Sequence, residues 1–182
     1  MPVQLNTYNN NWYKPGNVFK RVLWYFINMI FFKNGFFPFY SLKRGLLRLF
    51  GAKVGSGVLI KPFVNIKYPW FLEMGNDIWI GEKVWIDNLG KVVIGNNVCI
   101  SQGALLLSGN HDYTKTGFDL IIKPIRIDEG VWIGANAVVC AGATCNSHSV
   151  LTVGSVTAGE LDAYGIYQGN PAVKIKERKY NA

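Results

Sequence analysis

A six-residue repeat constrains the fold of this chain more than any other feature. Along much of the chain, apolar residues recur six positions apart, and a small or β-branched residue follows each of them four positions later. The apolar members are Val54, Ile60, Ile80, Ile94, Ile100, Ile127, Ile133, Val139, Cys145 and Leu151. Ten hexads of one kind are too many for a chance spacing, so the pattern indicates a structural repeat.

The repeat predicts a triangular prism of stacked coils. Three short strands make one coil, the chain turns a corner every six residues, and the first residue of each hexad points into a narrow interior. The position four residues later also faces inward, where only a small or β-branched side chain fits. Stacked coils satisfy each other's backbone hydrogen bonds. We therefore predict an all-β fold, a left-handed parallel β-helix, whose hand is opposite to the usual crossover preference.

The interruptions of the repeat are also informative. The spacing is eight rather than six from Leu72 to Ile80 and from Ile86 to Ile94, and Trp70 stands where a small residue is expected. We interpret these steps as two-residue bulges at corners. The largest interruption runs from Leu106 to Ile127, and we predict that residues 107–126 form a loop ejected from a corner. Long loops in compact domains usually carry function.

Two different segments flank the predicted β-helix, which we assign to residues 51–156. Residues 1–50 begin as an Asn-rich polar arm, and their pattern predicts two short helices, at about 18–32 and 41–50. Residues 157–182 are predicted to form a turn and a basic tail. Both segments are expected to cap the open ends of the prism.

The net charge of +8 belongs to the N-terminal part of the chain. Residues 1–72 contain ten Lys and Arg and no Asp or Glu. No nucleic-acid motif accompanies this charge, so we do not expect nucleic acid as a partner. Aromatic residues alternate with the cations, which fits peripheral attachment to an anionic membrane leaflet. The alternative is that the aromatics cap the first coils and the cations are solvated.

Cysteine usage and the absence of targeting signals favour a cytoplasmic protein. The three cysteines, Cys99, Cys140 and Cys145, form no CxxC pair, so neither a disulfide framework nor a zinc knuckle is indicated. The apolar run 22–32 is short for a membrane span of about 20 residues. No signal-peptide cleavage pattern follows it.

His111 is the candidate catalytic residue, because it lies in the ejected loop in the run SGNHDY. An imidazole has the unperturbed pKa that suits proton abstraction at neutral pH. The other histidine, His148, occupies an outward hexad position and is expected to be a solvated surface residue. Two histidines cannot supply the three that a catalytic zinc takes on this kind of fold, so no metal is expected.

Two polar residues at the second bulge, Asp87 and Asn88 in WIDNLG, could orient an acceptor. The alternative is corner chemistry, since Asp, Asn and Gly favour turns. The cysteines lie at or beside inward positions with no histidine near them in sequence. Packing therefore explains them better than nucleophilic catalysis does.

The sequence resembles the hexapeptide-repeat acyltransferases. Within them it is similar to the maltose, galactoside and nodulation-factor O-acetyltransferases, and most similar to the colanic acid biosynthesis acetyltransferases. The resemblance covers nearly the whole chain. It is carried by KYPWFLEMGNDIWIGE, WIDNLGKVVIGNNVCISQGALLLSGNHDY, VWIGANAVVCAGA and GNPAVKIKER.

The resemblance implies a homotrimer of parallel prisms with active sites between subunits and acetyl-CoA as co-substrate. The family's histidine falls on His111, and its sugar-contacting positions fall near Asp87 and Asn88, with Asp112 and Tyr113 beside the histidine. The residues that the likeness places along the CoA groove or near the nucleotide phosphates are Gly134, Ala135, Gly142, Val153, Gly154, Ser155, Lys174, Lys176 and Arg178. The chain departs from the family after Ser155, where an expected CoA-contacting lysine is missing.

These observations predict an acetyl-CoA-dependent O-acetyltransferase acting on a sugar hydroxyl of an exopolysaccharide or a lipid-linked saccharide precursor. His111 would act as general base for direct transfer in a ternary complex. Two alternatives stay open: N-acylation of a nucleotide-linked amino sugar, and a non-catalytic trimeric scaffold. The residues do not identify the acceptor sugar or the partner that orients His111.

Overall fold

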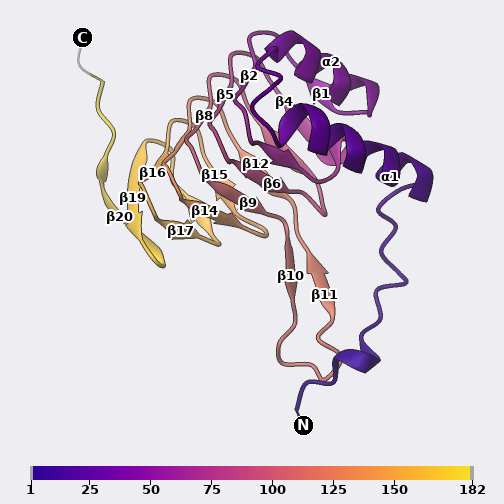
Figure 1. Cartoon of the computed structure of the whole chain (residues 1–182). Coiled ribbons are helices and arrows are strands. Elements are labelled where there is room, and N and C mark those ends of the chain that lie inside the picture. The colour runs from indigo at the N-terminus through magenta and orange to yellow at the C-terminus, as the bar shows by residue number, and fades with distance from the viewer. Residues whose placement is uncertain (1, 181–182) are drawn as a thin grey trace.

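The computed structural model describes residues 2–180, which form a column of stacked coils with two helices at one end (Figure 1). Three parallel sheets run along the column. Sheet A contains β1 (Lys53–Val54), β4 (Leu72–Met74), β7 (Val92–Ile94), β12 (Ile125–Ile127), β15 (Thr144–Cys145) and β18 (Glu160–Leu161). Sheet B contains β2 (Leu59–Ile60), β5 (Trp79–Ile80), β8 (Cys99–Ile100), β13 (Trp132–Ile133), β16 (Val150–Leu151), β19 (Gly165–Gly169) and β20 (Ala172–Glu177). Sheet C contains β3 (Asn65–Ile66), β6 (Trp85–Asp87), β9 (Leu105–Leu107), β14 (Val138–Cys140) and β17 (Val156–Thr157).

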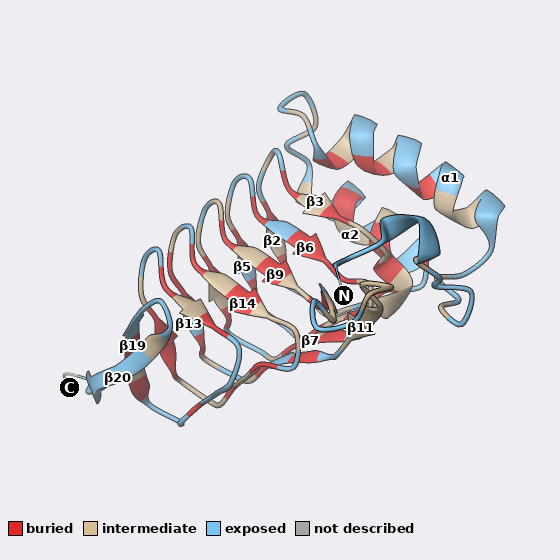
Figure 2. Cartoon of the chain, turned by 90° about the horizontal axis from the view of Figure 1, so that it is seen from below, coloured by how far each residue is buried: buried red, intermediate tan, exposed pale blue. Residues whose placement is uncertain are grey.

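The interior of the column is filled by the residues that the repeat placed there. On sheet B, Ile60, Ile80 and Ile100 lie in register on successive coils and are buried. The positions four residues after the inward ones are buried too, as at Val84 and Ala137. Figure 2 shows the buried residues recurring at the same place in each coil. The hexad pattern therefore predicted the core correctly.

The first bulge lies two residues away from its predicted place. Met74, not Leu72, is in register with Ile94, so the eight-residue step runs from Ile66 to Met74. Both Leu72 and Met74 are buried because β4 is three residues long and alternate residues of a strand share a face. A short 3₁₀ helix, η3 (Pro69–Phe71), fills the corner and contains Trp70. Trp70 therefore does not occupy the inward position at which the repeat requires a small residue.

The parallel coils also continue beyond residue 156, where the predicted β-helix ended. β17 pairs with β14, β18 with β15, and β19 with β16, so the stack extends to Gly169. The step from Thr157 to Leu161 is four residues instead of six, which ends the sequence repeat without ending the stacking. After a turn, β20 runs back antiparallel to β19 and forms the C-terminal end of the column.

Two helical segments cover the other end, as predicted from the pattern. A 3₁₀ turn, η1 (Leu5–Thr7), precedes α1 (Val18–Ile27), which continues into one π-helical turn, η2 (Asn28–Phe32), and is followed by α2 (Tyr40–Leu49). Trp24 is buried, and its Nε1–H donates to the Ile66 carbonyl over 2.8 Å. Within residues 2–180, no helix is long and apolar enough to cross a membrane.

Cations of α2 terminate the open end of the first coil. Lys43 is fully buried, and Arg44 and Arg48 extend over the neighbouring residues of the same coil. Burial lowers the pKa of Lys43 from 10.5 to about 8, which leaves it mostly charged at neutral pH. The bonds run from Lys43 Nζ to the carbonyls of Ile60 and Lys61 (3.1 Å each), from Arg44 Nη1 to Val58 (2.9 Å), and from Arg48 to Val54 and Gly55 (2.9 Å each). Part of the N-terminal positive charge is therefore structural.

We expect Lys43→Met to lower the free energy of unfolding by about 2 kcal/mol, because it leaves two buried carbonyls without their donor. Urea denaturation measures the loss. Lys53→Met is the matched control: Lys53 is an exposed lysine whose ion pair with Glu73 should contribute less than about 1 kcal/mol. Equal losses in the two variants would show that α2 does not cap the column through Lys43.

Candidate active site

One corner of the column differs from the other two. The turns from sheet A to B and from sheet B to C pass through residues with positive φ, such as Asn97 (57°) and Asn136 (54°). The turn from sheet C to A is longer on three successive coils. It takes eight positions from Ile66 to Met74, eight from Ile86 to Ile94, and 21 from Leu106 to Ile127. These three excursions stack on one edge of the prism, and we call this edge the irregular corner.

The longest excursion is a β-hairpin rather than an irregular loop. β10 (Gly109–His111) pairs antiparallel with β11 (Leu120–Ile122), and the hairpin projects away from the column (Figure 1). The N-terminal arm reaches the hairpin, where the Gln4 backbone N–H donates to the Thr116 carbonyl over 2.9 Å. The predicted excursion at 107–126 is therefore present, and the arm braces it.

Three contacts fix the imidazole of His111. Its Nδ1 lies 2.8 Å from the Phe118 carbonyl oxygen, and its ring stacks on the Phe118 ring at 4.4 Å with 7° between the planes. The ring of Tyr8, from the arm, lies 5.7 Å away. A carbonyl only accepts hydrogen bonds, so Nδ1 carries the proton and Nε2 presents its lone pair. Phe118 is therefore the orienting partner that the sequence did not identify.

His111 lines an open cavity of about 470 Å³ between the hairpin, the arm and the irregular corner. The Tyr13 hydroxyl donates to the Leu89 carbonyl over 2.6 Å and ties the arm to that corner. Burial raises the pKa of Tyr13, so its hydroxyl stays protonated. The other lining residues are Tyr8, Asn10, Asn11, Lys14, Pro15, Arg21, Lys67, Tyr68, Leu89 and Leu120. Most of them precede residue 90, and sequence analysis missed the contribution of the arm because no motif marks it.

The cavity carries an excess of positive charge. Lys14, Arg21 and Lys67 line it, and the Asp87 carboxylate pairs with Lys67 at 2.9 Å. The Nε atom of Arg21 is buried and has no hydrogen-bond partner within residues 2–180. Arg21 therefore lines the same cavity as His111 and forms no ion pair with a carboxylate within residues 2–180.

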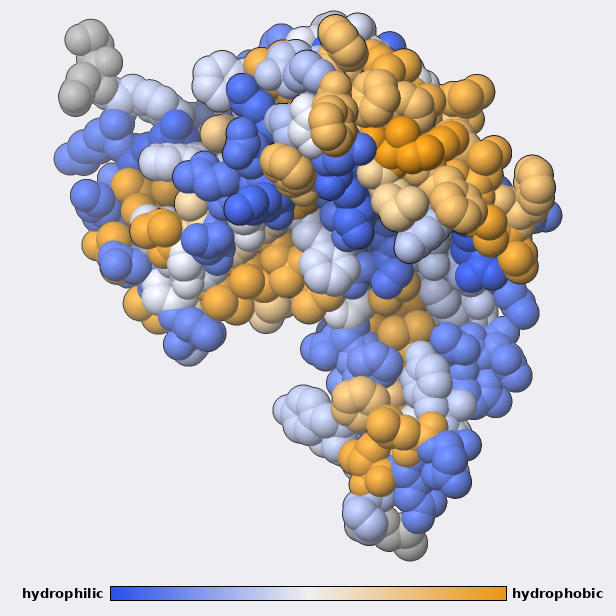
Figure 3. All heavy atoms as spheres, in the orientation of Figure 1, coloured by the Kyte–Doolittle hydropathy of each residue, from blue (hydrophilic) through white to orange (hydrophobic). Residues whose placement is uncertain are grey.

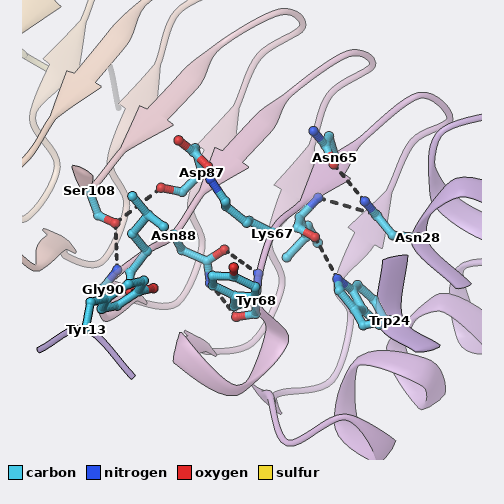
Figure 4. A network of polar contacts seen from close by, with 12 residues as sticks. Tyr13, Trp24, Asn28, Asn65, Lys67, Tyr68, Asp87, Asn88, Gly90 and Ser108 are labelled. Carbon is cyan, nitrogen blue, oxygen red and sulfur yellow. Dashed lines mark hydrogen bonds and ion pairs between the residues drawn. The ribbon is translucent and has the colours of Figure 1, made fainter. Parts of the chain in front are cut away.

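Asp87 and Asn88 lie at the irregular corner, and their side chains bond to neighbouring residues of that corner (Figure 4). Asn88 is fully buried; its Oδ1 accepts from the Tyr68 backbone N–H at 3.0 Å, and its Nδ2 donates to the Tyr68 carbonyl at 2.6 Å. Within one chain both ends of the amide therefore hold Tyr68, and the contact of Asn88 with an acceptor stays a prediction. Asp87 is 8% exposed and reaches the cavity through Lys67.

Asp112 and Tyr113 lie near the tip of the hairpin, outside the His111 cavity. Asp112 Oδ1 accepts from the backbone N–H (3.0 Å) and the hydroxyl (2.6 Å) of Thr114, and these bonds lower the pKa of Asp112. The Tyr113 side chain is 77% exposed. Within one chain, neither residue is placed to contact an acceptor bound beside His111.

The predicted cofactor residues divide between two corners. Gly134 and Ala135 stack on Val153 and Gly154 at the corner between sheets B and C, where the Gly154 N–H donates to the Ala135 carbonyl over 2.9 Å. Gly142 lies instead at the irregular corner, where its N–H donates to the Pro124 carbonyl over 3.1 Å. Ser155 is buried beside the first group, and its Oγ accepts from the Gly169 N–H at 3.0 Å.

The basic tail is an ordered strand, β20, rather than a mobile segment. Lys174 forms ion pairs with Asp162 (3.1 Å) and Glu177 (2.7 Å). The Arg178 guanidinium donates to two backbone carbonyls, at 2.8 Å and 3.2 Å. Lys176 is exposed, and no ion pair or side-chain hydrogen bond engages it among the described residues. Two of the three predicted phosphate contacts are therefore already engaged within the chain.

The remaining candidate groups have structural roles. His148 lies at a regular corner with φ 61°, is half-buried rather than fully solvated, and stacks on Tyr164 at 4.9 Å. Burial raises the pKa of all three thiols, that of Cys145 to about 12, so none is set up as a nucleophile. No three His, Cys, Asp or Glu of residues 2–180 gather in a metal-binding group.

Comparisons with known proteins identify relatives of this chain, although no family model matches it. It is 37% identical over 166 residues to the protein named colanic acid biosynthesis acetyltransferase WcaF of Escherichia coli (strain K12), covering 91% of both chains. It is 27% identical over 139 residues to the galactoside O-acetyltransferase of the same organism, covering 74% of this chain and 68% of that one.

Solved structures show the same fold. A hexapeptide-repeat acetyltransferase of Vibrio cholerae, solved with acetyl coenzyme A, superposes with a TM-score of 0.78 at 21% identity over 88% of each chain. A galactoside acetyltransferase in complex with coenzyme A superposes with a TM-score of 0.77 at 25% identity, over 88% of this chain and 81% of that one. The predicted fold class, a left-handed parallel β-helix of hexapeptide repeats, is confirmed.

The column of hexapeptide coils is the fold of the hexapeptide-repeat acyltransferases, and the 37% identity to an acetyltransferase over 91% of both chains places this chain in that class. More narrowly, the chain belongs to the family of acetyltransferases that includes WcaF, since the identity extends over nearly the full length of both proteins. The resemblance stated from the sequence is thus confirmed.

We expect Asn88→Ala to lower the free energy of unfolding by about 3 kcal/mol, because it strands the Tyr68 N–H and carbonyl in the irregular corner. Asn146→Ala is the control: it removes an exposed amide that donates to Glu160, and should cost about 0.5 kcal/mol. Chemical denaturation of both variants gives the comparison. If Asn88→Ala is as stable as the control, the amide does not support Tyr68.

Proposed function

We propose that this protein transfers an acetyl group from acetyl-CoA to a sugar hydroxyl, with His111 as general base. The observation that carries the proposal is the 2.8 Å contact between His111 Nδ1 and the Phe118 carbonyl in the wall of a ligand-sized cavity. It fixes the tautomer in which Nε2 is the basic atom. Names of relatives support the same reaction: WcaF is named for colanic acid biosynthesis, and another relative is a galactoside O-acetyltransferase.

In the proposed reaction, Nε2 accepts the proton of the hydroxyl as its oxygen attacks the thioester carbonyl. The tetrahedral intermediate collapses, the carbon–sulfur bond breaks, and the imidazolium returns the proton to the departing thiolate. No covalent acyl-enzyme is needed, which fits the raised thiol pKa values. A backbone N–H is expected to stabilise the oxyanion.

Acetyl-CoA is proposed to lie along the groove between prisms. The stacked turns at Gly134 and Ala135 and at Val153 and Gly154 offer backbone to a pantetheine arm, and Gly154 leaves it accessible, because a Cβ there would meet nothing within 4 Å. Lys176 is the tail cation best placed to meet the nucleotide phosphates, since Lys174 and Arg178 already have partners. Hexapeptide-repeat acetyltransferases solved with acetyl coenzyme A or coenzyme A support this co-substrate.

A homotrimer is part of the proposal. Sheet B carries an outward apolar row in which Trp79, Cys99 and Trp132 lie in register on successive coils. Trp79 is 62% exposed, and a flat apolar row of this kind is a natural subunit contact. Light scattering should therefore give three times the mass of one chain, and a monomeric value at all concentrations contradicts the assignment.

The cavity favours an acidic or phosphorylated saccharide as acceptor. Within residues 2–180 Arg21 pairs with no carboxylate, and Lys14 adds a second cation at the cavity wall. A phosphate or uronate oxygen would pair with the Arg21 guanidinium, which lines the cavity. We therefore propose a charged precursor of an exopolysaccharide, or a lipid-linked saccharide, in preference to a neutral free sugar.

Replacing His111 by Ala should lower turnover by roughly 100-fold to 10,000-fold, the range of a lost general base, while affinity for acetyl-CoA stays nearly unchanged. Steady-state kinetics and calorimetric titration with CoA measure the two quantities. His148→Ala is the matched control, because that histidine belongs to a regular corner on the other side of the column. If the His111→Ala variant turns over a competent acceptor at nearly the wild-type rate, His111 is not the general base.

Thermal unfolding with CoA, followed by product analysis, separates this proposal from its two rivals. A ligand that binds only the native state raises the midpoint, by an amount equivalent to about 2.7 kcal/mol at a hundred times Kd. A scaffold shows no such shift. Mild alkali removes an O-acetyl group from the product and leaves an N-acetyl group in place. An alkali-stable product would therefore establish amine acylation.

A further inference from the structure

Helix α1 and the following η2 turn are apolar on the face that points away from the protein. Exposed apolar side chains recur at the three- and four-residue spacing that places residues on one helical face. They are Phe19, Val22, Leu23, Phe26, Met29 and Ile30. The face turned toward the column instead includes Lys20, Arg21 and Asn28. The inward face also carries Trp24 and Ile27, which pack in the core, so α1 is apolar on both faces, whereas the outer face of an ordinary surface helix is polar.

The exposed stripe continues onto neighbouring segments to form one apolar surface. Phe36, between η2 and α2, is 86% exposed, and Phe39 is 61% exposed. Figure 3 shows the hydrophobic side chains gathered over the N-terminal helices, at the end of the column away from the C-terminus. We call this surface, made by the six residues of the stripe with Phe36 and Phe39, the apolar cap surface. A contiguous exposed patch rich in aromatics marks an interaction site.

Charge around the apolar cap surface has a single sign. The α2 cations are engaged by backbone carbonyls, but Lys33 and Lys61 are exposed at its border. The Lys61 ammonium lies 5.9 Å from the Tyr40 ring. The first acidic residue of the chain is Glu73, in sheet A, where it pairs with Lys53 and Lys91. A protein partner would meet no acidic group here, whereas an anionic lipid surface complements both the aromatics and the lysines.

We propose that the apolar cap surface docks the protein on a bilayer that contains anionic lipids. The stripe lies in the interface plane with its phenylalanines among the upper acyl chains, and Lys33 and Lys61 contact the headgroups. Because no helix within residues 2–180 is long enough to span a membrane, the attachment is peripheral. The expected cytoplasmic location makes the occupied leaflet the inner one.

A second observation connects this surface with the interior of the molecule. A cavity of about 300 Å³ runs beneath α1, and its walls include Tyr25, Met29 and Lys33. It shares Arg21, Lys67 and Tyr68 with the cavity of His111. A docked protein would therefore hold the His111 cavity beside the membrane surface, with Arg21 between the two. This arrangement holds whether or not the protein catalyses the proposed acetyl transfer.

Vesicle co-sedimentation tests the proposal on the full-length chain. We expect binding to vesicles of phosphatidylcholine mixed with phosphatidylglycerol, weaker binding to phosphatidylcholine alone, and release by high salt. The triple variant Phe19→Ser, Phe26→Ser, Phe36→Ser should lower the partition coefficient on the order of 100-fold. The double variant Lys33→Gln, Lys61→Gln should lower it roughly 30-fold, and only on anionic vesicles.

The control variant carries three equally drastic changes at exposed apolar positions elsewhere: Leu5→Ser, Val173→Ser, Ile175→Ser. It should bind like the wild type. Thermal melts confirm that both triple variants are folded, which the exposure of the changed side chains predicts. A wild-type chain that stays in the supernatant at low salt overturns the proposal. So does a phenylalanine variant that loses oligomer mass in light scattering but keeps its vesicle binding, since the surface is then a subunit contact.

Discussion

Each coil of this protein depends on the next coil for its backbone hydrogen bonds. A two- or three-residue strand has no partner within its own coil, so the parallel pairs along sheets A, B and C are the bonds that hold the column together. Both ends of the column would expose unpaired backbone groups. At one end Lys43, Arg44 and Arg48 donate to the first coil, and at the other β20 pairs with β19. The termini of the chain therefore complete the fold.

The same dependence explains why the candidate site occupies one corner. At the two regular corners, successive turns stack closely, and a Cβ added to Gly95 or Gly134 would lie within 3.0 Å of the backbone of the next coil. Those corners leave no room for an insertion. The irregular corner accepts extra residues on three successive coils, and each excursion supports another: Asn88 holds Tyr68, and Ser108 Oγ accepts from the Gly90 N–H at 2.9 Å. A rigid column thus supplies a fixed base for His111.

Whether the sequence predicted a feature depends on how far apart along the chain its interacting residues lie. The inward residues, the helices and the excursion at 107–126 each leave a local pattern, and they were predicted. The position of the first bulge was wrong because Leu72 and Met74 are both apolar and both buried, so the pattern alone fits two registers. The last coil was missed because a four-residue step breaks the repeat. The roles of Tyr8, Tyr13 and Arg21 depend on an arm meeting a hairpin about a hundred positions away, which no local pattern records.

Helix α1 links the candidate site to the apolar cap surface. A helix has room for two faces, and this one turns Arg21 toward the cavity of His111 while Phe19 and Phe26 point outward. Burying cations and an amide on the inward face costs free energy unless these groups form hydrogen bonds. The Asn28 amide forms them, since it donates to Asn65 Oδ1 and accepts from the Ile66 N–H. Among residues 2–180 no carboxylate pairs with Arg21, which lines the cavity, so the inward face keeps a requirement for an anionic partner. A ligand that carries both an anionic group and a lipid would meet that requirement and the outer face together, because both belong to one helix.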